Sequence, residues 1–342
     1  MHRPRVLYTD PPWLVDGGRA VPELATVERE TLGARAELRF GPFVDGRYAH
    51  NDELARLAAG CDVLVVYRCR ITRGLLDAAG ERLRAVVRQG VGVDNLDLPL
   101  LAERRLLAYH VPDYCVDEVA THTSALALAL ERRLVAQHNG LSGGTFDIYA
   151  GGVPHRINRR TLGVVGFGRI GRAVARRLGA FYGQVLVHDP HIGRDLPEGY
   201  GALAVDSLDE LLESSDVVTL HCPLTGATEG LIGAAELARM RAGSFLVNAA
   251  RGALVDPAAL GSALRGGRLA GAGLDVFAPE NPHDDPLWKD VLDHPAVIVT
   301  SHRAFLSREA EHSSRRRVAE LARDLLAGGQ PTVGRLSPAG LR

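Results

Sequence analysis

Short apolar runs alternate along this chain with segments whose apolar residues recur at helical spacing. In the first 109 residues the apolar runs include RVLYTD, DVLVVY and RAVVRQG, and helical segments such as NDELARLAAG lie between them. Short apolar runs are typical of buried strands, and intervening helices favour a parallel sheet covered on its faces. From Thr161 onward the alternation resumes with six further runs, from TLGVVG to AVIVTS. The pattern therefore predicts an α/β protein with two parallel sheets, of which the second suits a doubly wound dinucleotide fold.

Between these two regions the pattern changes. Residues 115–133, CVDEVATHTSALALALERR, predict a long and largely buried helix. The stretch NGLSGGTFDIYAGGVPHRINRR, residues 139–160, is rich in glycine and has no clear period, so we expect an extended loop or arm there. Near the end of the sequence, SREAEHSSRRRVAELARDLLAGG predicts a helix with one charged face.

Composition narrows the class of protein. The chain has 342 residues, enough for two domains of about 150 residues each. Its 40 basic and 41 acidic side chains nearly cancel, which argues against direct binding to nucleic acid or to an acidic membrane. Lys289 is the single lysine, so most Schiff-base chemistry is excluded. There is no signal-peptide pattern and no apolar run of about 18 residues, so we expect a cytoplasmic protein. Neither a zinc motif nor a disulfide framework is formed by the cysteines, Cys61, Cys69, Cys115 and Cys222.

A glycine motif indicates the cofactor. Gly166, Gly168 and Gly171 form a GxGxxG that follows the apolar strand TLGVV and opens a helix through Arg169 and Ile170. In this context the first glycine permits a tight turn, the second lets the backbone approach a pyrophosphate, and the third lets helix and strand pack closely. The start of the helix then offers unpaired N–H groups to the phosphates.

An acidic residue favours NAD over NADP. Asp189 ends the next predicted strand, QVLVHDP, 18 residues after Gly171. A carboxylate at this place accepts hydrogen bonds from the ribose hydroxyls of NAD and repels a 2′-phosphate. We therefore expect NAD(H) as the cofactor.

Three neighbouring strand ends carry ionisable residues. Arg251 follows the apolar run SFLVNAA, Asp275 and then Glu280 follow GLDVF, and His302 follows VIVTS. In a doubly wound sheet the ligand binds beyond the carboxyl ends of the strands, so these side chains should converge on one crevice. A guanidinium binds a carboxylate through two parallel hydrogen bonds, and an imidazole exchanges a proton near neutral pH. Together with a hydride carrier they predict interconversion of a 2-keto acid and a 2-hydroxy acid.

The sequence resembles the D-isomer-specific 2-hydroxyacid dehydrogenases over nearly its whole length. The ending SHRAFLSREA most resembles the branch that contains the C-terminal-binding proteins and their bacterial dehydrogenase relatives. The resemblance rests on GVGVDNLD, VPDYCVDEVATH, LGVVGFGRIGRAVARRL, LHCPLT, LVNAARGALVD, GAGLDVFAPE and TSHRAF.

The resemblance implies a role for each matching residue. Arg251 would bind the substrate carboxylate and polarise the keto group, and His302 would be the general acid/base paired with Glu280. The backbone N–H groups of Val91 and Gly92 would also bind the substrate carboxylate. Cys222 is expected to line the cofactor cleft as a packing residue. The further cofactor contacts would be Pro223, Thr225, Ala249, Asp275 and Ala304.

The resemblance also implies the domain organisation. A smaller flavodoxin-like substrate-binding domain would combine residues 1–109 and 305–342, and a Rossmann NAD-binding domain, residues 110–304, would be inserted in it. The helix from residue 117 and the arm at 138–160 would form a homodimer contact. The sequence departs from the family pattern at Ser301, where proline is usual, at Thr121 and at Phe146.

Several alternatives stay open at this level. Arg68 follows the strand DVLVVY and would contact a second anionic group of the substrate, or it is simply solvated. Trp288 either caps the substrate pocket or packs in the core. The same fold also serves NADH-responsive dimeric binding proteins of the corepressor type, and a phosphonate analogue or phosphite is another possible substrate. Neither the particular 2-hydroxy acid nor the direction of the reaction is fixed by the sequence.

Overall fold

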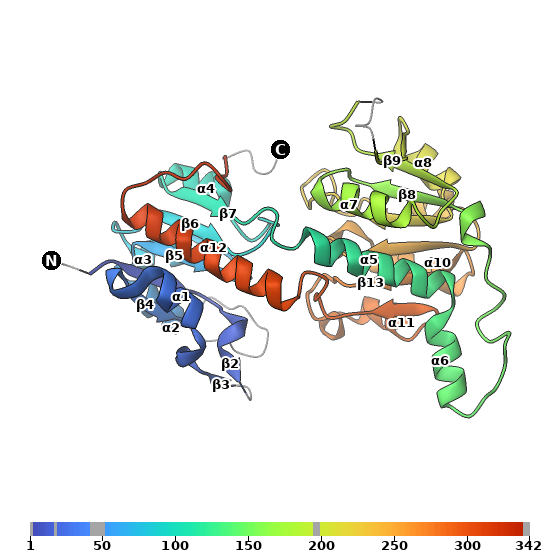
Figure 1. Ribbon diagram of the computed structural model, residues 1–342, viewed down its shortest axis with the longest axis horizontal. Coiled ribbons are helices and arrows are strands. Elements are labelled where there is room, and N and C mark those ends of the chain that lie inside the picture. Colours follow the sequence, from blue (N-terminus) through green and yellow to red (C-terminus); the bar gives the residue numbers. More distant parts are fainter. Residues whose placement is uncertain (1–2, 17–18, 42–51, 194–198, 338–342) are drawn as a thin grey trace. The chain divides into compact units, whose positions relative to one another are not determined.

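The computed structural model describes residues 3–16, 19–41, 52–193 and 199–337 (Figure 1). The chain divides into two compact units. We call Met1–Tyr114 with Ser307–Arg342 the terminal unit, and Cys115–Leu306 the central unit. Among the described residues, none of the helices combines the length and the apolar character that crossing a membrane requires.

The terminal unit is built on a parallel sheet in the order β4-β1-β5-β6-β7. Apart from the short antiparallel pair β2–β3, this is the order 2-1-3-4-5 of flavodoxin-like folds. The strands are β1 (Arg5–Tyr8), β2 (Val15–Asp16), β3 (Arg19–Ala20), β4 (Glu37–Phe40), β5 (Val63–Val66), β6 (Ala85–Arg88) and β7 (Leu107–His110). The α-helices are α1 (Thr26–Leu32), α2 (Asp52–Ala58), α3 (Arg73–Ala79), α4 (Leu98–Glu103) and α12 (Arg308–Leu326).

Apolar side chains cover both faces of this sheet. Val318, Ala319 and Ala322 of α12 pack with Val6 and Val63 on one face. On the other face α2, α3 and α4 pack against alternate residues of the same strands. The periodicity of α12 therefore buries one side of a helix whose other side is charged, as its sequence predicts.

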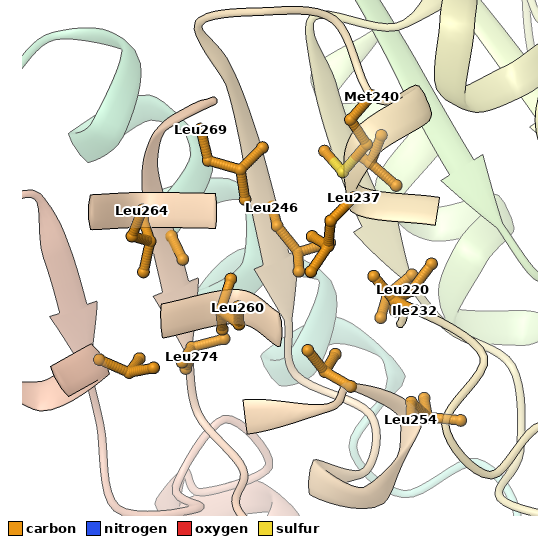
Figure 2. Close-up of a cluster of buried hydrophobic side chains, with 14 of the residues drawn as sticks. Leu220, Ile232, Leu237, Met240, Leu246, Leu254, Leu260, Leu264, Leu269 and Leu274 are labelled. Atoms are coloured by element: carbon orange, nitrogen blue, oxygen red, sulfur yellow. The ribbon is translucent and has the colours of Figure 1, made fainter. Parts of the chain in front are cut away.

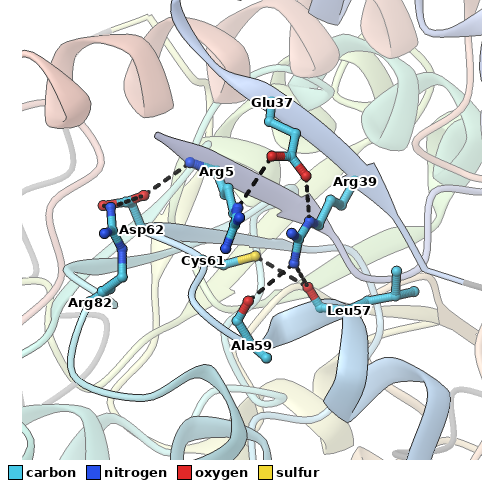
Figure 3. A network of polar contacts seen from close by, with 8 residues as sticks. All are labelled: Arg5, Glu37, Arg39, Leu57, Ala59, Cys61, Asp62 and Arg82. Carbon is cyan, nitrogen blue, oxygen red and sulfur yellow. Dashed lines mark hydrogen bonds and ion pairs between the residues drawn. The ribbon is translucent and has the colours of Figure 1, made fainter. Parts of the chain in front are cut away.

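Charged side chains tie together the amino-terminal edge of the same sheet (Figure 3). Glu37 bridges the guanidinium groups of Arg5 and Arg39, at 3.2 and 2.8 Å. The buried carboxylate of Asp62 accepts the Arg5 amide at 2.9 Å and binds Arg82 at 3.3 Å. These ion pairs lie at the edge opposite to the one where ligands bind in such folds, so their role is structural.

The central unit contains a larger parallel sheet in the order β10-β9-β8-β11-β12-β13-β14. Numbered within the unit, this is the Rossmann order 3-2-1-4-5-6 followed by one more strand. The strands are β8 (Thr161–Val165), β9 (Gln184–His188), β10 (Leu203–Ala204), β11 (Val217–Leu220), β12 (Ser244–Asn248), β13 (Leu269–Leu274) and β14 (Val297–Val299). The α-helices are α5 (Val116–Glu131), α6 (Leu134–Ser142), α7 (Arg169–Leu178), α8 (Leu208–Ser214), α9 (Ala234–Arg239), α10 (Pro257–Arg265) and α11 (Lys289–Leu292).

Two apolar layers cover the faces of the central sheet. Figure 2 shows one of them, in which Leu237, Leu260 and Leu264 from α9 and α10 meet Leu246 and Leu274 of the strands. On the other face α5 and α7 lie side by side (Figure 1) and pack on β8, β9 and β12. The predicted fold class, two doubly wound parallel sheets in an α/β protein, is confirmed.

Some local elements differ from the predictions. The long helix predicted for residues 115–133 ends at Glu131, because Arg133 adopts a left-handed backbone (φ +55°), and a separate helix, α6, follows. The strands β2, β3 and β10 have two residues each, and the sequence gives no indication of them. A two-residue strand is too short to show a period of two.

Candidate active site

The glycine motif of the central unit forms a tight strand-to-helix turn. Gly166 has φ +89°, and a Cβ on it would lie 2.6 Å from the amide nitrogen of Cys222. A Cβ on Gly171 would lie 2.1 Å from the carbonyl oxygen of Gly166. In contrast, a Cβ on Gly168, the N-cap of α7, would have no heavy atom within 4 Å. Packing therefore requires the first and third glycines, whereas the second faces open space where a pyrophosphate could approach the start of the helix.

Asp189 lies at the end of β9, beside this turn. Its Oδ2 accepts a hydrogen bond from the Phe167 amide at 2.8 Å, and its Oδ1 accepts one from the His191 amide at 2.9 Å. The carboxylate therefore fixes the glycine turn, and each oxygen keeps a second lone pair for a hydroxyl. A hollow adjoins it, lined by Val187, His188, Asp189, Pro190, Ile192, Gly193, Ala204, Val205 and Asp206.

The loop after β11 carries the next three predicted cofactor contacts. The Thr228 hydroxyl donates to the Pro223 carbonyl at 2.6 Å and accepts the Thr225 amide at 2.8 Å, so the loop is internally braced. Cys222 is half-buried, and burial raises the pKa of its thiol to about 11. A thiol with this pKa is almost wholly neutral at pH 7, which agrees with a packing role rather than a nucleophilic one.

Arg251 follows β12 in a turn that a buried asparagine shapes. Asn248 accepts the Ala250 amide at 3.0 Å and donates its Nδ2 to the Arg251 carbonyl at 2.9 Å. A Cβ on Gly252 would lie 2.0 Å from the carbonyl carbon of Phe277. Gly252, next to Arg251, is therefore required by the close approach of the loop that follows β13. Asn248 was not among the predicted site residues. The signal that could have identified it is a polar residue at the end of the apolar run SFLVN.

His302 and Glu280 meet at the ends of β14 and β13. The Nδ1 of His302 lies 2.5 Å from Oε1 of Glu280. The imidazole also packs edge-on against the Phe305 ring, with 6.1 Å between the ring centroids. His302 itself has a left-handed backbone (φ +50°), which is uncommon for a residue with a side chain. A carboxylate can only accept, so the proton of this bond belongs to Nδ1. The structure thus brings together the two residues predicted as an acid–base pair.

Asp275 lies beneath the turn that carries His302. Its fully buried carboxylate accepts the Thr300 hydroxyl at 2.5 Å and the amides of Arg303 and Ala304 at 3.0 and 2.9 Å. Its own carbonyl accepts the His302 amide at 2.7 Å. We predicted Asp275, Ala304 and Ala249 as cofactor contacts. All three are buried in the central unit, and the bonds of Asp275 are directed at the His302 turn.

In the terminal unit, Asp10 organises the loop after β5. Its carboxylate accepts the successive amides of Tyr67, Arg68 and Cys69, at 2.9, 2.6 and 2.8 Å. The guanidinium groups of Arg68 and Arg88 lie 5.5 and 5.6 Å from the centre of the Tyr67 ring. Neither Asp10 nor Arg88 was predicted as a site residue.

Val91 and Gly92 form part of the loop after β6, in the terminal unit. Both are half-buried, and the Val91 carbonyl lies 2.8 Å from Nδ1 of His110 at the end of β7. Gly90 precedes them with φ +156°, and a Cβ on it would lie 2.3 Å from the Arg88 guanidinium. The position of the Arg88 guanidinium therefore leaves room only for glycine at position 90.

Trp288 packs in the core and does not cap a pocket. It is 1% exposed, and its Nε1 donates to the Ala278 carbonyl at 3.0 Å. Its ring packs edge-on against Phe277, with 5.1 Å between the ring centroids. Of the two readings left open for this residue, packing is the one that the structure supports. In the part of the chain that the structure describes, no group of three His, Cys, Asp or Glu side chains could hold a metal ion.

Known protein families and relatives match this sequence over most of its length. Residues 124–304 match the NAD binding domain of the D-isomer specific 2-hydroxyacid dehydrogenases. The chain is 37% identical to the D-3-phosphoglycerate dehydrogenase of Methanocaldococcus jannaschii over 81% of this chain and 52% of the relative. It is also 37% identical to the corresponding enzyme of Mycobacterium tuberculosis, over 90% of this chain and 56% of the relative. The chain thus spans about half the length of these relatives.

Solved structures with the same fold include two dehydrogenases or reductases of small acids. D-lactate dehydrogenase from Aquifex aeolicus, solved with NAD and lactic acid, has a TM-score of 0.83 and 29% identity, covering 94% of this chain and 96% of that one. A glyoxylate reductase from Paecilomyes thermophila has a TM-score of 0.82 and 26% identity, covering 98% of each chain. The motif resemblance is confirmed: the chain belongs to the D-isomer specific 2-hydroxyacid dehydrogenase family and contains its NAD-binding domain.

Proposed function

We propose that the protein is an NAD(H)-dependent D-2-hydroxyacid dehydrogenase, or 2-keto acid reductase. The observation that carries this proposal is the His302–Glu280 pair, 2.5 Å apart, at strand ends next to that of Arg251. These three residues follow strands of the same sheet that carries the glycine turn and Asp189. An acid–base pair, an anion-binding guanidinium and a dinucleotide site together suit hydride transfer to a carbonyl.

Each residue has a defined chemical part in the reduction. Bound NADH supplies a hydride to C2 of the keto acid. Arg251 binds the carboxylate and stabilises the charge that develops on the keto oxygen. His302 gives that oxygen a proton from Nε2, while Glu280 holds Nδ1 and stabilises the imidazolium form. In the oxidation of the hydroxy acid the same nitrogen accepts the proton.

The cofactor site fits NAD. The amides at the start of α7, beyond Gly168, would bind the pyrophosphate, with Arg169 and Ile170 in the first turn of the helix. Asp189 would accept the ribose hydroxyls, and the hollow beside it would hold the adenosine.

We further propose that the substrate carries a second anionic group, bound by Arg68. Supporting this, Arg68 and Arg88 flank the Tyr67 ring at the carboxyl ends of the neighbouring strands β5 and β6. The curated relatives described above are named for a substrate, D-3-phosphoglycerate, that has both a carboxylate and a phosphate. The amides of Val91 and Gly92 would bind the carboxylate.

We also propose that the chain works as a homodimer. Helix α6 and the segment after it expose large apolar side chains, including Leu141, Phe146, Tyr149 and Val153, which are 62, 86, 65 and 71% exposed. An exposed apolar patch of this kind is typical of a protein interface. A second copy of the chain, docked through this segment, would cover it, and sedimentation equilibrium would measure the mass of the assembly.

A screen of 2-keto acids with NADH tests the proposed activity. It should include glyoxylate, phenylpyruvate, phosphonopyruvate and a phosphorylated 2-keto acid, with NADPH in a parallel series. We expect NADH-dependent reduction of at least one acid, and a lower kcat/KM with NADPH. Binding of NADH without turnover of any acid would instead favour the NADH-responsive binding protein.

A further inference from the structure

We propose that His122 and Thr300 position the catalytic turn by a hydrogen-bond chain that ends on Asp275. This inference rests on the role proposed above for His302. It assigns a function to two residues outside the predicted site, one of which lies on α5, far from His302 in the sequence. His122 and Thr300 touch neither reacting atoms nor cofactor in this assignment, so they are positioning residues.

The chain of hydrogen bonds has a single direction. The Thr300 hydroxyl lies 2.5 Å from Oδ1 of Asp275 and 2.9 Å from Nε2 of His122. A carboxylate only accepts, so the one hydroxyl proton of Thr300 is committed to Asp275. The same hydroxyl oxygen must then accept a proton from His122. The order is therefore His122 Nε2–H to Thr300 Oγ1–H to Asp275 Oδ1, which fixes the tautomer of His122 if its ring is neutral.

The carboxylate at the end of this chain holds the strained turn. Asp275 is fully buried, and it binds the turn at Thr300, Arg303 and Ala304, on both sides of His302. His302 keeps a left-handed backbone at φ +50°. Such a conformation persists only where surrounding bonds over-determine it. The donors on Asp275 provide that constraint, and they set the direction in which the imidazole leaves the backbone.

The same chain of bonds joins the two ends of the central unit. His122 lies on α5, the first helix of the unit, whereas the turn at 300–304 lies just before its last residue, Leu306. His122 also lies 3.6 Å from Asp275 Oδ1, so its ring closes the network from the side of α5. Asp275 thus accepts hydrogen bonds from the end of the unit, and Thr300 links it to His122 at the beginning of the unit.

Loss of this network should impair catalysis while the glycine turn, which the network does not touch, stays intact. A displacement of about 1 Å in a catalytic group costs on the order of 100-fold in rate. We expect Thr300→Val, which keeps the shape but removes the hydroxyl, to lower kcat about tenfold to 100-fold, with a much smaller change in the Kd for NADH. Thr300→Ser restores the hydroxyl and should stay within about threefold of wild type. His122→Leu should resemble Thr300→Val, and His122→Gln, whose amide still donates, should recover part of the loss.

A proton NMR measurement tests the inference without turnover. The His302 Nδ1–H that is bonded to Glu280 should give a downfield signal, identified by its loss in His302→Gln. We expect the signal in wild type and Thr300→Ser, and its loss or broadening in Thr300→Val and His122→Leu. The inference would be wrong if Thr300→Val or His122→Leu kept the NMR signal and, where the wild-type protein is an active enzyme, also kept the wild-type kcat. If wild type reduced no 2-keto acid, the proposed function would fail, and the NMR comparison would still decide the positioning role. The His122 variants keep the test open if Thr300→Val does not fold.

Discussion

The Nδ1 atom of His302 lies 2.5 Å from Oε1 of Glu280, and this pair defines how the imidazole can take part in proton transfer. With Nδ1 committed to a carboxylate, proton exchange with the substrate is assigned to Nε2. Asp275 stabilises the turn that carries His302. Its carboxylate accepts hydrogen bonds from the Thr300 hydroxyl and from two backbone amides of the turn, all within the central unit. The acid–base residue is thus oriented by the fold before any substrate binds.

Removing the charge of Glu280 should slow turnover while leaving the cofactor site intact. Glu280→Gln keeps the size of the side chain but no longer stabilises the imidazolium. We expect kcat for 2-keto acid reduction to fall at least about tenfold; complete loss of a general acid–base group costs more, about 100- to 10,000-fold, but His302 itself remains. The Kd of NADH, measured by fluorescence quenching, should stay near that of wild type. A variant with wild-type kcat would show that the pair has no part in proton transfer.

Two glycines of the same motif should respond oppositely to alanine. Gly168 faces open space, so Gly168→Ala should keep the thermal midpoint and raise the Kd of NADH at least tenfold or so, because the new methyl group occupies the pyrophosphate position. In Gly171→Ala the Cβ would meet the Gly166 carbonyl oxygen at 2.1 Å. Overpacking of this kind costs about 1–3 kcal/mol, so unfolding in urea should shift to lower denaturant. Normal NADH affinity in Gly168→Ala would contradict the assigned pyrophosphate site.

Cys222 should react slowly with alkylating reagents at neutral pH. Burial raises the pKa of its thiol from 9.0 to about 11. At pH 8 the thiolate fraction is then about 100-fold smaller than for a thiol with the unshifted pKa, and the rate should rise about tenfold per pH unit towards pH 11. Mass spectrometry of the peptide after timed exposure to iodoacetamide measures this rate. Rapid labelling at pH 7 would show that Cys222 is a reactive thiol and not a packing residue.

His221 should make the fold less stable in mild acid. Its Nε2 is buried, and burial lowers the pKa of the imidazole from 6.5 to about 3. The unfolded chain therefore binds a proton near pH 6.5 that the folded chain does not accept. The free energy of unfolding should fall by about 1.4 kcal/mol per pH unit as the pH drops from about 6.5 towards 3.

Replacing His221 alone isolates this contribution. In His221→Gln the difference in unfolding free energy between pH 6.5 and pH 5 should be smaller than in wild type by about 2 kcal/mol. Urea unfolding at both pH values measures the difference. Equal pH dependence in the two proteins would show that the folded protein protonates His221 readily.

Local patterns in the sequence predicted the parts of the site that depend on local geometry. The glycine turn needs only a strand, three glycines and a helix, and all of them are adjacent in the chain from Thr161 to Leu178. Arg251, Glu280 and His302 could be placed because strand ends in a parallel sheet share one edge. The pairing of His302 with Glu280 followed from the family resemblance, and the structure places the two side chains in contact.

The supporting residues could not be predicted because their partners are distant in the sequence. His122 meets Thr300 across 178 positions, and Asp10 meets the amide of Arg68 across 58. His122 ends the stretch VPDYCVDEVATH, which carries part of the family resemblance, but nothing in the local sequence around His122 or Asp10 indicates its distant partner. For Trp288 the sequence left open whether the ring caps the pocket or packs in the core, and the structure buries it. Burial of such a side chain depends on how several helices pack, and a single segment does not encode it.

The most direct test of the central claim is the reduction of 2-keto acids by Arg251→Ala. Loss of the guanidinium should leave the Kd of NADH near the wild-type value and lower kcat/KM by about 100-fold or more, because carboxylate binding and charge stabilisation are both lost. Arg265→Ala is a matched control, since this exposed arginine of the same unit pairs with Asp290 on the surface. The account predicts a large loss in Arg251→Ala and none in Arg265→Ala. Unchanged turnover in Arg251→Ala would contradict it.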